Sequence, residues 1–299
     1  MACPTLSPPQ LLRHPAAPSS SFSTKFPVLF PSALPPLILV EPRRLRHCCG
    51  AVSLAGVDSA AVIQDAGATV LVVGGAYALV STFDGLTRRR IIEQNLSRKL
   101  VHILSGLLFL ASWPIFSTSR GARYFASLVP SLNFLRLVIN GLSLTKDEGL
   151  IKSVSREGKP EELLRGPLYY VLVLILSAIL FWRDSPVGMI SLAMMCAGDG
   201  IADIMGRRFG DLKIPYNPQK SLVGSMSMFL FGFLVSIGML YYFEMLGYVH
   251  LEWFKTIARV AIVSLVATMV ESLPITGVVD DNISVPLATM VCASILFHD

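Results

Sequence analysis

The sequence has few charged residues and few cysteines for its length. Only 15% of its 299 residues are charged, whereas soluble domains usually carry about 25%, and 53% are hydrophobic. This balance excludes an ordinary soluble globular protein. Three of the five cysteines lie near the N-terminus, and the other two, Cys196 and Cys292, lie within apolar blocks. The cysteines therefore provide neither a disulfide framework nor a metal cluster.

Acidic residues are almost missing from the first 60 positions, where Glu41 is the only one before Asp58. Ten of the nineteen prolines lie between Pro4 and Pro42, which excludes a long helix or a sheet core. A basic, Ser-rich, acid-poor leader is typical of an organelle transit peptide, and its prolines favour the chloroplast. A disordered tail without a targeting role is the alternative. We expect a chloroplast transit peptide and disordered leader at 1–60, cleaved between about 45 and 65, and a polytopic membrane domain at 61–299.

Long apolar segments dominate the rest of the chain. Each has roughly 16 to 22 residues, close to the length that crosses a bilayer as a helix. The sequence therefore predicts an all-α, multi-span integral membrane helical bundle with seven or eight transmembrane helices. The segments are 66–83, 100–117, 124–141, 166–182, 186–202, 221–243, 257–272 and 283–297.

Basic residues are distributed unequally between alternate loops. The loops 84–99, 142–165 and 203–220 carry fourteen Lys and Arg, whereas 118–123, 183–185 and 244–256 carry four. This asymmetry places the first three loops together on the stromal or cytosolic face. Lys and Arg confined to short loops do not form the continuous basic surface that binds nucleic acid. We therefore expect the protein to lie in a lipid bilayer and to bind no nucleic acid.

The segment 196–225 contains the most informative polar pattern. Asp199 and Asp203 stand four residues apart, so a helix would place both carboxylates on one face. Such acids are costly near a membrane unless a positive charge compensates them, and Mg²⁺ carrying phosphates is one candidate. In the alternative, Asp203 pairs with Arg207 one turn later. Glycines that would let backbone approach a ligand closely are Gly198, Gly200, Gly206 and Gly224.

Phosphate-binding groups are also expected around the start of the next apolar segment. Lys220 and Ser221 directly precede or begin this segment, and Ser225 follows in its first turn. A helix N-terminus with a lysine and hydroxyl groups nearby suits an anionic phosphate.

Two further polar clusters flank apolar segments. In 271–287, Glu271 ends the seventh segment, and Asp280, Asp281 and Asn282 precede the eighth without a basic residue nearby. Either Asp281 or Asn282 would serve as a helix N-cap, which is the structural alternative to a catalytic role. The other cluster consists of Arg98, Lys99 and His102. Arg98 and His102 share a helix face, and a lone histidine of this kind is more often structural than catalytic.

Several familiar motifs are absent, which narrows the chemistry. The chain has no GxxxxGK[ST] phosphate-binding loop and no dinucleotide fingerprint after a strand. The prenyl-diphosphate motif DDxxD fails because Ser284 stands where its last Asp would be. The CDP-alcohol phosphotransferase opening DGxxAR fails at Asp199–Asp203, which is one residue short and lacks the arginine.

Four runs of sequence nevertheless resemble the polyprenol kinase family, which includes dolichol kinase and the plastid phytol and farnesol kinases. They are SRKLVHILSG at 97–106, GDGIADIMGRRFG at 198–210, KSLVGS at 220–225 and ESLPITGVVDDNISVPL at 271–287. The similarity covers nearly everything after residue 60 and is greatest to the plant chloroplast phytol kinase branch. It implies a membrane enzyme that phosphorylates an isoprenoid alcohol such as phytol for tocopherol synthesis, with CTP or another nucleoside triphosphate as donor. The Mg²⁺ expected from the paired acids would be its cofactor.

With this resemblance, each cluster takes a role in phosphoryl transfer. Asp199 and Asp203 would hold the metal, and Glu271, Asp280, Asp281 or Asn282 would hold a second metal or accept the alcohol proton. His102 would act with Arg98 and Lys99 on the transferred phosphoryl group. The nucleotide-binding set is Gly198, Gly200, Lys220, Ser221, Gly224, Ser225, Arg98 and Lys99.

Other functions remain open from the residues alone. A farnesol or geranylgeraniol kinase would carry the same motifs. A cytidylyltransferase acting on a lipid phosphate would use a similar CTP and metal site but would release pyrophosphate. A transporter predicts inverted repeats with broken helices in both halves, whereas these acidic clusters lie in the second half of the chain.

Overall fold

The computed structural model describes residues 59–298 except 146, 156–157 and 275–279. These residues lie in one compact unit that spans Ser53–Asp299. The predicted transit peptide and its cleavage region lie almost entirely outside the described residues, so that prediction stays a prediction.

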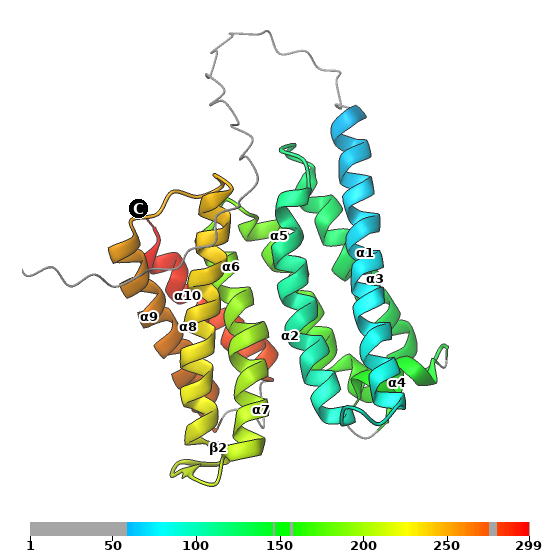
Figure 1. Cartoon of the computed structure of the whole chain (residues 1–299), viewed down its shortest axis with the longest axis vertical. Helices are drawn as coiled ribbons and strands as arrows, with labels where there is room; N and C mark the ends of the chain where they lie inside the picture. The colour runs from blue at the N-terminus through cyan, green and yellow to red at the C-terminus, as the bar shows by residue number, and fades with distance from the viewer. Residues whose placement is uncertain (1–58, 146, 156–157, 275–279, 299) are drawn as a thin grey trace, which may run out of the picture. The chain divides into compact units, whose positions relative to one another are not determined.

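The described part of the chain is almost entirely helical, as the sequence predicts (Figure 1). The elements are α1 (Ser59–Arg88), α2 (Gln94–Ser112), η1 (Trp113–Ile115), α3 (Ala122–Gly141), α4 (Glu148–Val154), η2 (Pro160–Leu164), α5 (Gly166–Phe181), α6 (Pro186–Ala193), η3 (Met194–Asp199), α7 (Gly200–Phe209), β1 (Lys213–Ile214), β2 (Asn217–Ser221), α8 (Leu222–Met245), α9 (Trp253–Ser272) and α10 (Asp281–Leu296). Each of the eight predicted apolar segments coincides with one of these helices or with a continuous helical run.

The predicted number of transmembrane helices, seven or eight, is not confirmed. Among the described residues, five helical runs are long and apolar enough to cross a membrane. They are Ser59–Arg88, Pro160–Phe181, Pro186–Phe209, Leu222–Met245 and Trp253–Ser272. The helices α2 and α3 are long enough but less apolar, and α10 has only 16 residues. The polar residues Arg98, Lys99 and His102 lower the mean hydropathy of α2.

The continuous run α6–η3–α7 is the most deeply packed part of the bundle. In its most apolar window 83% of the residues are buried, whereas the corresponding window of α1 is only 11% buried. The segment Met194–Asp199 is a π-helical turn, a local distortion often found at functional sites. Asp199 ends this turn, so the distortion sets the position of an acidic side chain inside the bundle.

Helix starts follow local capping chemistry. The side chain of Ser185 accepts from the backbone N–H of Val187 at the start of α6, and Ser221 accepts from Gly224 at the start of α8. Asp280 accepts from the N–H of Asn282 and so caps α10. Each cap satisfies a donor that the first turn leaves unpaired.

A polar cluster holds the N-terminal part of α1 against the segment that follows α2. The buried carboxylate of Asp65 accepts hydrogen bonds from the N–H and hydroxyl of Ser117 and from the hydroxyl of Ser119. The buried guanidinium of Arg183 donates to the carbonyl oxygens of Phe116 and Ser117. The bonds of Asp65 anchor α1, whose most apolar window is only 11% buried.

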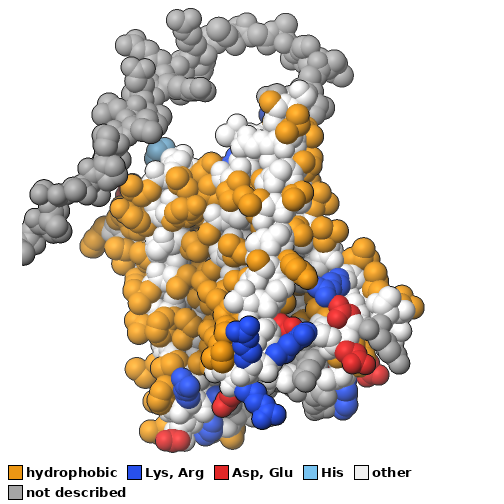
Figure 2. Space-filling view, turned by 45° about the vertical axis from the view of Figure 1, so that its right-hand side comes forward, with side chains coloured by type: hydrophobic (Ala, Val, Ile, Leu, Met, Phe, Trp, Pro, Cys, Tyr) orange, Lys and Arg blue, Asp and Glu red, His pale blue; other side chains and the backbone are white. Residues whose placement is uncertain are grey.

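The opposite end of the bundle is strongly charged. Residues of all three basic-rich loops line one cavity at this end. The loops therefore lie together, in agreement with the common face predicted for them. Figure 2 shows Lys, Arg, Asp and Glu side chains gathered at the lower end, while hydrophobic side chains dominate the rest of the visible face. This distribution is expected of a helical bundle that carries a polar site at one membrane surface.

Candidate active site

A short hairpin brings two distant parts of the chain together. Strands β1 and β2 pair antiparallel, and the apolar pattern of the sequence does not predict them. The side-chain amide of Asn217 donates to the carbonyl oxygens of Ser272 and Leu273 at the end of α9. The hydroxyl of Tyr216 lies 2.9 Å from that of Ser272. The hairpin is thus fastened to α9, and β2 carries Lys220 to the carboxylate that ends this helix.

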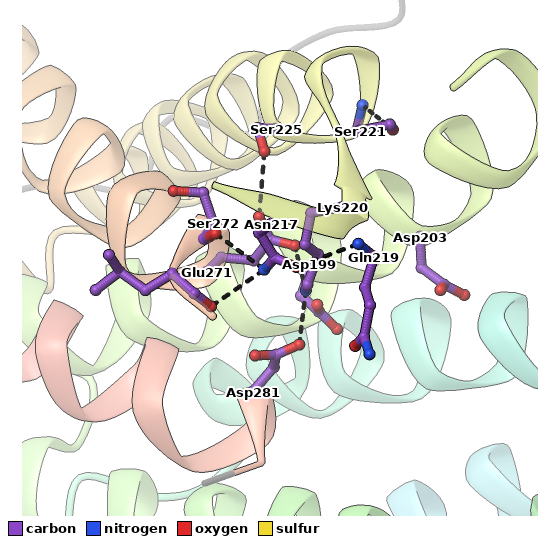
Figure 3. A network of polar contacts seen from close by, with 12 residues as sticks. Asp199, Asp203, Asn217, Gln219, Lys220, Ser221, Ser225, Glu271, Ser272 and Asp281 are labelled. Carbon is purple, nitrogen blue, oxygen red and sulfur yellow. Dashed lines mark hydrogen bonds and ion pairs between the residues drawn. The ribbon is translucent and has the colours of Figure 1, made fainter. Parts of the chain in front are cut away.

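Lys220 is the centre of the polar network in Figure 3. Its ammonium donates to Oε1 of Glu271 at 2.5 Å and to Oδ2 of Asp281 at 2.8 Å. Burial alone would lower the pKa of Lys220, but the two carboxylates outweigh this effect and raise it above its ordinary value. The two carboxylates therefore favour the charged form of Lys220, which supplies the partner that Glu271 and Asp281 lack in their own part of the sequence.

Lys99 plays a similar part for the other acidic pair. Its ammonium lies 3.6 Å from Oδ2 of Asp199 and 3.5 Å from Oδ2 of Asp203. Asp203 also pairs with Arg207 at 2.9 Å, one turn along α7. The pairing of Asp203 with Arg207, which the sequence offered as an alternative to a metal site, is therefore present. Asp199 points into the bundle and pairs with no arginine of its own helix among the described residues.

A candidate metal centre combines residues from both acidic clusters. One carboxylate oxygen each from Asp199, Glu271 and Asp281 lies within 4.8 Å of the other two. Oxygen ligands of this kind suit Mg²⁺. In addition, Oδ1 of Asp281 is buried without a hydrogen-bond partner in the described part of the chain. The donor set fits a divalent cation. Asp203 does not belong to this group, in contrast to the predicted pairing of Asp199 with Asp203.

The acids before α10 have distinct roles. The helix cap expected at Asp281 or Asn282 is in fact Asp280, one position earlier. Asp280 also accepts from the side-chain amide of Asn282 at 2.8 Å. Asp281 is therefore released from capping and turns to Lys220. Asp280 and Asn282 line the same cavity as Asp281, so all three remain near the site.

The hydroxyl groups at the start of α8 are engaged by the protein itself. Ser221 caps the helix through Gly224, and the hydroxyl of Ser225 donates to Oε2 of Glu271 at 3.3 Å. Ser225 therefore orients the carboxylate of Glu271, a role that the sequence did not indicate.

The four candidate glycines have a packing role in this structure. A Cβ at Gly200 would lie 2.3 Å from Ile103 on α2, and a Cβ at Gly206 would lie 2.9 Å from the hydroxyl of Ser221. Gly224 faces α7, and Gly198 faces Gly232 on α8. Gly206 and Gly224 line the cavity, whereas Gly198 and Gly200 are not among its lining residues. These glycines let the helices that carry the site approach one another.

The acidic side chains, the two lysines and the two serines of the site line one cavity of about 1790 Å³. Arg98 and His102 line it from α2. The ring of His102 packs against Tyr170, with centroids 4.1 Å apart. The cavity extends from the charged end toward apolar side chains of α1, α2, α3 and α5. Such a chamber can hold a charged group and a hydrocarbon at the same time.

Several known proteins are similar to this chain over most of its length, and they carry the same name. A Glycine max protein named probable phytol kinase 1, chloroplastic, is 64% identical over 94% of this chain and 91% of its own. Phytol kinase 1, chloroplastic, of Arabidopsis thaliana is 66% identical over 81% of this chain and 79% of its own. A Triticum aestivum protein named probable phytol kinase, chloroplastic, is 53% identical over 95% and 97%.

The chain belongs to the chloroplastic phytol kinase family. No family model matches it, and no solved structure matches it. The relatives' names confirm the resemblance that the four sequence motifs carry. As a member of this family, the protein is a transferase of the kinase type with apolar, membrane-associated helices.

Several residues at the site of this phytol kinase family member could not be identified from the sequence. Asn217, which fastens the hairpin, lies in the run PYNPQK, where the prolines indicate a turn but not its tertiary partner. Tyr170 donates to the carbonyl oxygen of His102 and lies 3.2 Å from the hydroxyl of Ser105. Both hydroxyl groups line the cavity, and nothing in their spacing distinguishes them from ordinary helix residues.

Proposed function

We propose that this protein transfers the γ-phosphoryl group of CTP to the hydroxyl group of phytol in a chloroplast membrane. The product, phytyl phosphate, would enter tocopherol synthesis. The names of the relatives support phytol as acceptor and the chloroplast as location. The observation that carries the proposal is the convergence of Asp199, Lys220, Glu271 and Asp281 at the charged end of a cavity whose other end is apolar.

The cations of the site suit the charges of the donor. Lys99 and Lys220 each bridge two carboxylates, so their ammonium groups are held in place before a nucleotide binds. Arg98 lines the same chamber. We assign these three side chains to the phosphates, because phosphoryl transfer depends mainly on positioning and on neutralisation of negative charge.

The acids take the remaining roles. Asp199 and Glu271, with one oxygen of Asp281, would hold Mg²⁺, which supplies charge neutralisation on the nucleotide phosphates. Oδ1 is the oxygen of Asp281 that would face this cation, since Oδ2 is already held by Lys220. Ser225 keeps Glu271 oriented through its hydrogen bond. Asp280 maintains the start of α10 and so the position of Asp281.

The orientation in the membrane follows from charge. Lys and Arg are concentrated at the end that carries the site, which favours the stromal or cytosolic side for this end. Nucleotides are soluble and reach the site from that side. Phytol reaches it from the bilayer.

Product analysis tests the proposal directly. The purified full-length protein, in lipid nanodiscs with Mg²⁺, phytol and CTP, should form phytyl phosphate and CDP in equal amounts. Farnesol, geranylgeraniol, UTP and ATP in parallel reactions would show the preferred acceptor and donor. Release of pyrophosphate from CTP with a lipid-phosphate acceptor would identify a cytidylyltransferase instead. Absence of any alcohol phosphorylation would overturn the proposal.

A further inference from the structure

The cavity has two chemically different parts. Charged residues such as Asp199 and Lys220 line one end. Beyond Ser105 and Tyr170, the lining becomes apolar and includes Val72, Phe109 and Leu174. We call this second part the apolar arm and define it by Val72, Phe109, Val129, Val171 and Leu174. These residues come from α1, α2, α3 and α5, so four helices enclose the arm.

The path from the charged end to the tip of the arm is long enough for much of an extended isoprenoid chain. Lys99 and Phe109 both line the cavity and are ten positions apart on α2, which corresponds to about 15 Å along the helix axis. Val72, Phe109 and Leu174 are all at most 6% exposed. The far end of the arm is therefore closed by buried apolar side chains, as a pocket that measures chain length requires.

The side of the arm opens to the surroundings of the bundle. Tyr77 on α1 and Leu132 on α3 line the cavity, yet they are 69% and 55% exposed. The helix α1 buries only 11% of its most apolar window, so most of its surface is left for lipid. A hydrophobic molecule dissolved in the bilayer can enter beside α1 without crossing the charged end.

We propose that the apolar arm binds the hydrocarbon chain of the isoprenoid alcohol and that Phe109 and Leu174 at its closed end limit the length of chain accepted. This inference rests on the proposed alcohol kinase function. With the end of the chain at Phe109 and Leu174, the chain passes Ser105 and Tyr170, and its hydroxyl group lies in the charged end, toward Lys99. The bilayer-facing opening suits a substrate that never leaves the membrane. Apolar burial along the arm supplies the binding free energy.

Filling the end of the arm provides the first test. Leu174→Trp should raise KM for phytol and geranylgeraniol at least tenfold. It should change KM for the shorter geraniol less than twofold and leave KM for CTP unchanged. Leu176→Trp is the matched control, because Leu176 is 40% exposed on the same helix and does not line the cavity. Equal losses with long and short alcohols, or equal losses in both variants, would overturn the inference.

A photoreactive probe tests occupancy without relying on turnover or on a folded Trp variant. A phytol analogue with a diazirine at the end of its chain, added to the wild-type protein in nanodiscs, should label peptides of α2 or α5 that contain Phe109 or Leu174. Excess phytol should prevent this labelling, whereas excess phospholipid should not. Labelling confined to other helices, or prevented equally by phospholipid, would contradict the assignment and indicate a site for bulk lipid. Labelling of the arm in a protein without alcohol kinase activity would overturn the proposed function and leave chain binding intact.

Discussion

Lys220 and Glu271 are 51 positions apart in the sequence, and their side chains meet at 2.5 Å. The contact depends on the hairpin that Asn217 fastens to α9. It joins two motifs that are separate in the sequence, KSLVGS and ESLPITGVVDDNISVPL, into one site. Asp281 completes the arrangement by accepting a second hydrogen bond from the same ammonium group.

Removal of the central cation should abolish catalysis. Lys220→Ala leaves the buried Glu271 and the half-buried Asp281 without their cation, and loss of one partner of a buried ion pair costs about 3–5 kcal/mol. We expect turnover to fall at least a hundredfold, with a lower melting temperature in detergent. Lys255→Ala is the control, since Lys255 is 61% exposed and pairs only with Glu252 among the described residues. Retention of more than a tenth of the activity by Lys220→Ala would show that this lysine has no catalytic importance.

The two acids beside Lys99 should differ in their effect on metal dependence. Asp199 belongs to the carboxylate group that fits a cation, whereas Asp203 is held by Lys99 and Arg207. Asp199→Asn should lower turnover at least a hundredfold and raise the Mg²⁺ concentration needed for half-maximal rate. Asp203→Asn should have a smaller effect on both quantities. Titration of the initial rate with Mg²⁺ measures this difference. A larger effect of Asp203→Asn than of Asp199→Asn would contradict the assignment and indicate Asp203 as a metal ligand.

The close approach of three helices behind the site should depend on Gly106. A Cβ at this position would lie 2.1 Å from Sγ of Cys196 and 2.5 Å from the hydroxyl of Tyr170. Overpacking of this kind costs about 1–3 kcal/mol, so Gly106→Ala should lower the melting temperature and the yield of folded protein. Gly74→Ala is the matched control, because a Cβ there meets no atom within 4 Å. Alanine in a helix is favoured over glycine by about 0.5–1 kcal/mol, so the control should be neutral or stabilising. Equal melting temperatures for the two variants would contradict the packing argument.

The long helices could be predicted from the sequence because each contains a long apolar segment, whereas the short α4 and η2 do not. Each apolar segment coincides with a helix or a helical run. The number of spans could not be settled in the same way, since α2 and α3 exchange apolar residues for polar ones where they line the cavity. Hydropathy averages over a window and does not distinguish a lipid-facing position from a cavity-facing one.

Which carboxylates meet could be predicted only in part. The motifs identified Asp199, Glu271 and Asp281 as candidates, but spacing along one helix suggested Asp203 as the partner of Asp199. The π-helical turn at Met194–Asp199 changes the local register, and the hairpin adds a contact over a long sequence distance. Neither feature has a signal in the pattern of apolar residues. The sequence predicted that the glycines let backbone approach a ligand. It could not show their contacts with neighbouring helices, because these depend on tertiary packing.

The measurement that tests the central claim most directly compares Asp280→Asn and Asp281→Asn in the same assay. The structure makes Asp280 a helix cap and Asp281 a partner of Lys220. Asn caps a helix about as well as Asp, so Asp280→Asn should transfer the γ-phosphoryl group of labelled CTP to phytol at a rate within about threefold of wild type. Asp281→Asn removes a charge on which the site depends and should lower this rate at least a hundredfold with an unchanged yield of folded protein. Near-normal transfer by Asp281→Asn would contradict the account, because the cluster around Lys220 would then be a structural feature and the active site would lie elsewhere.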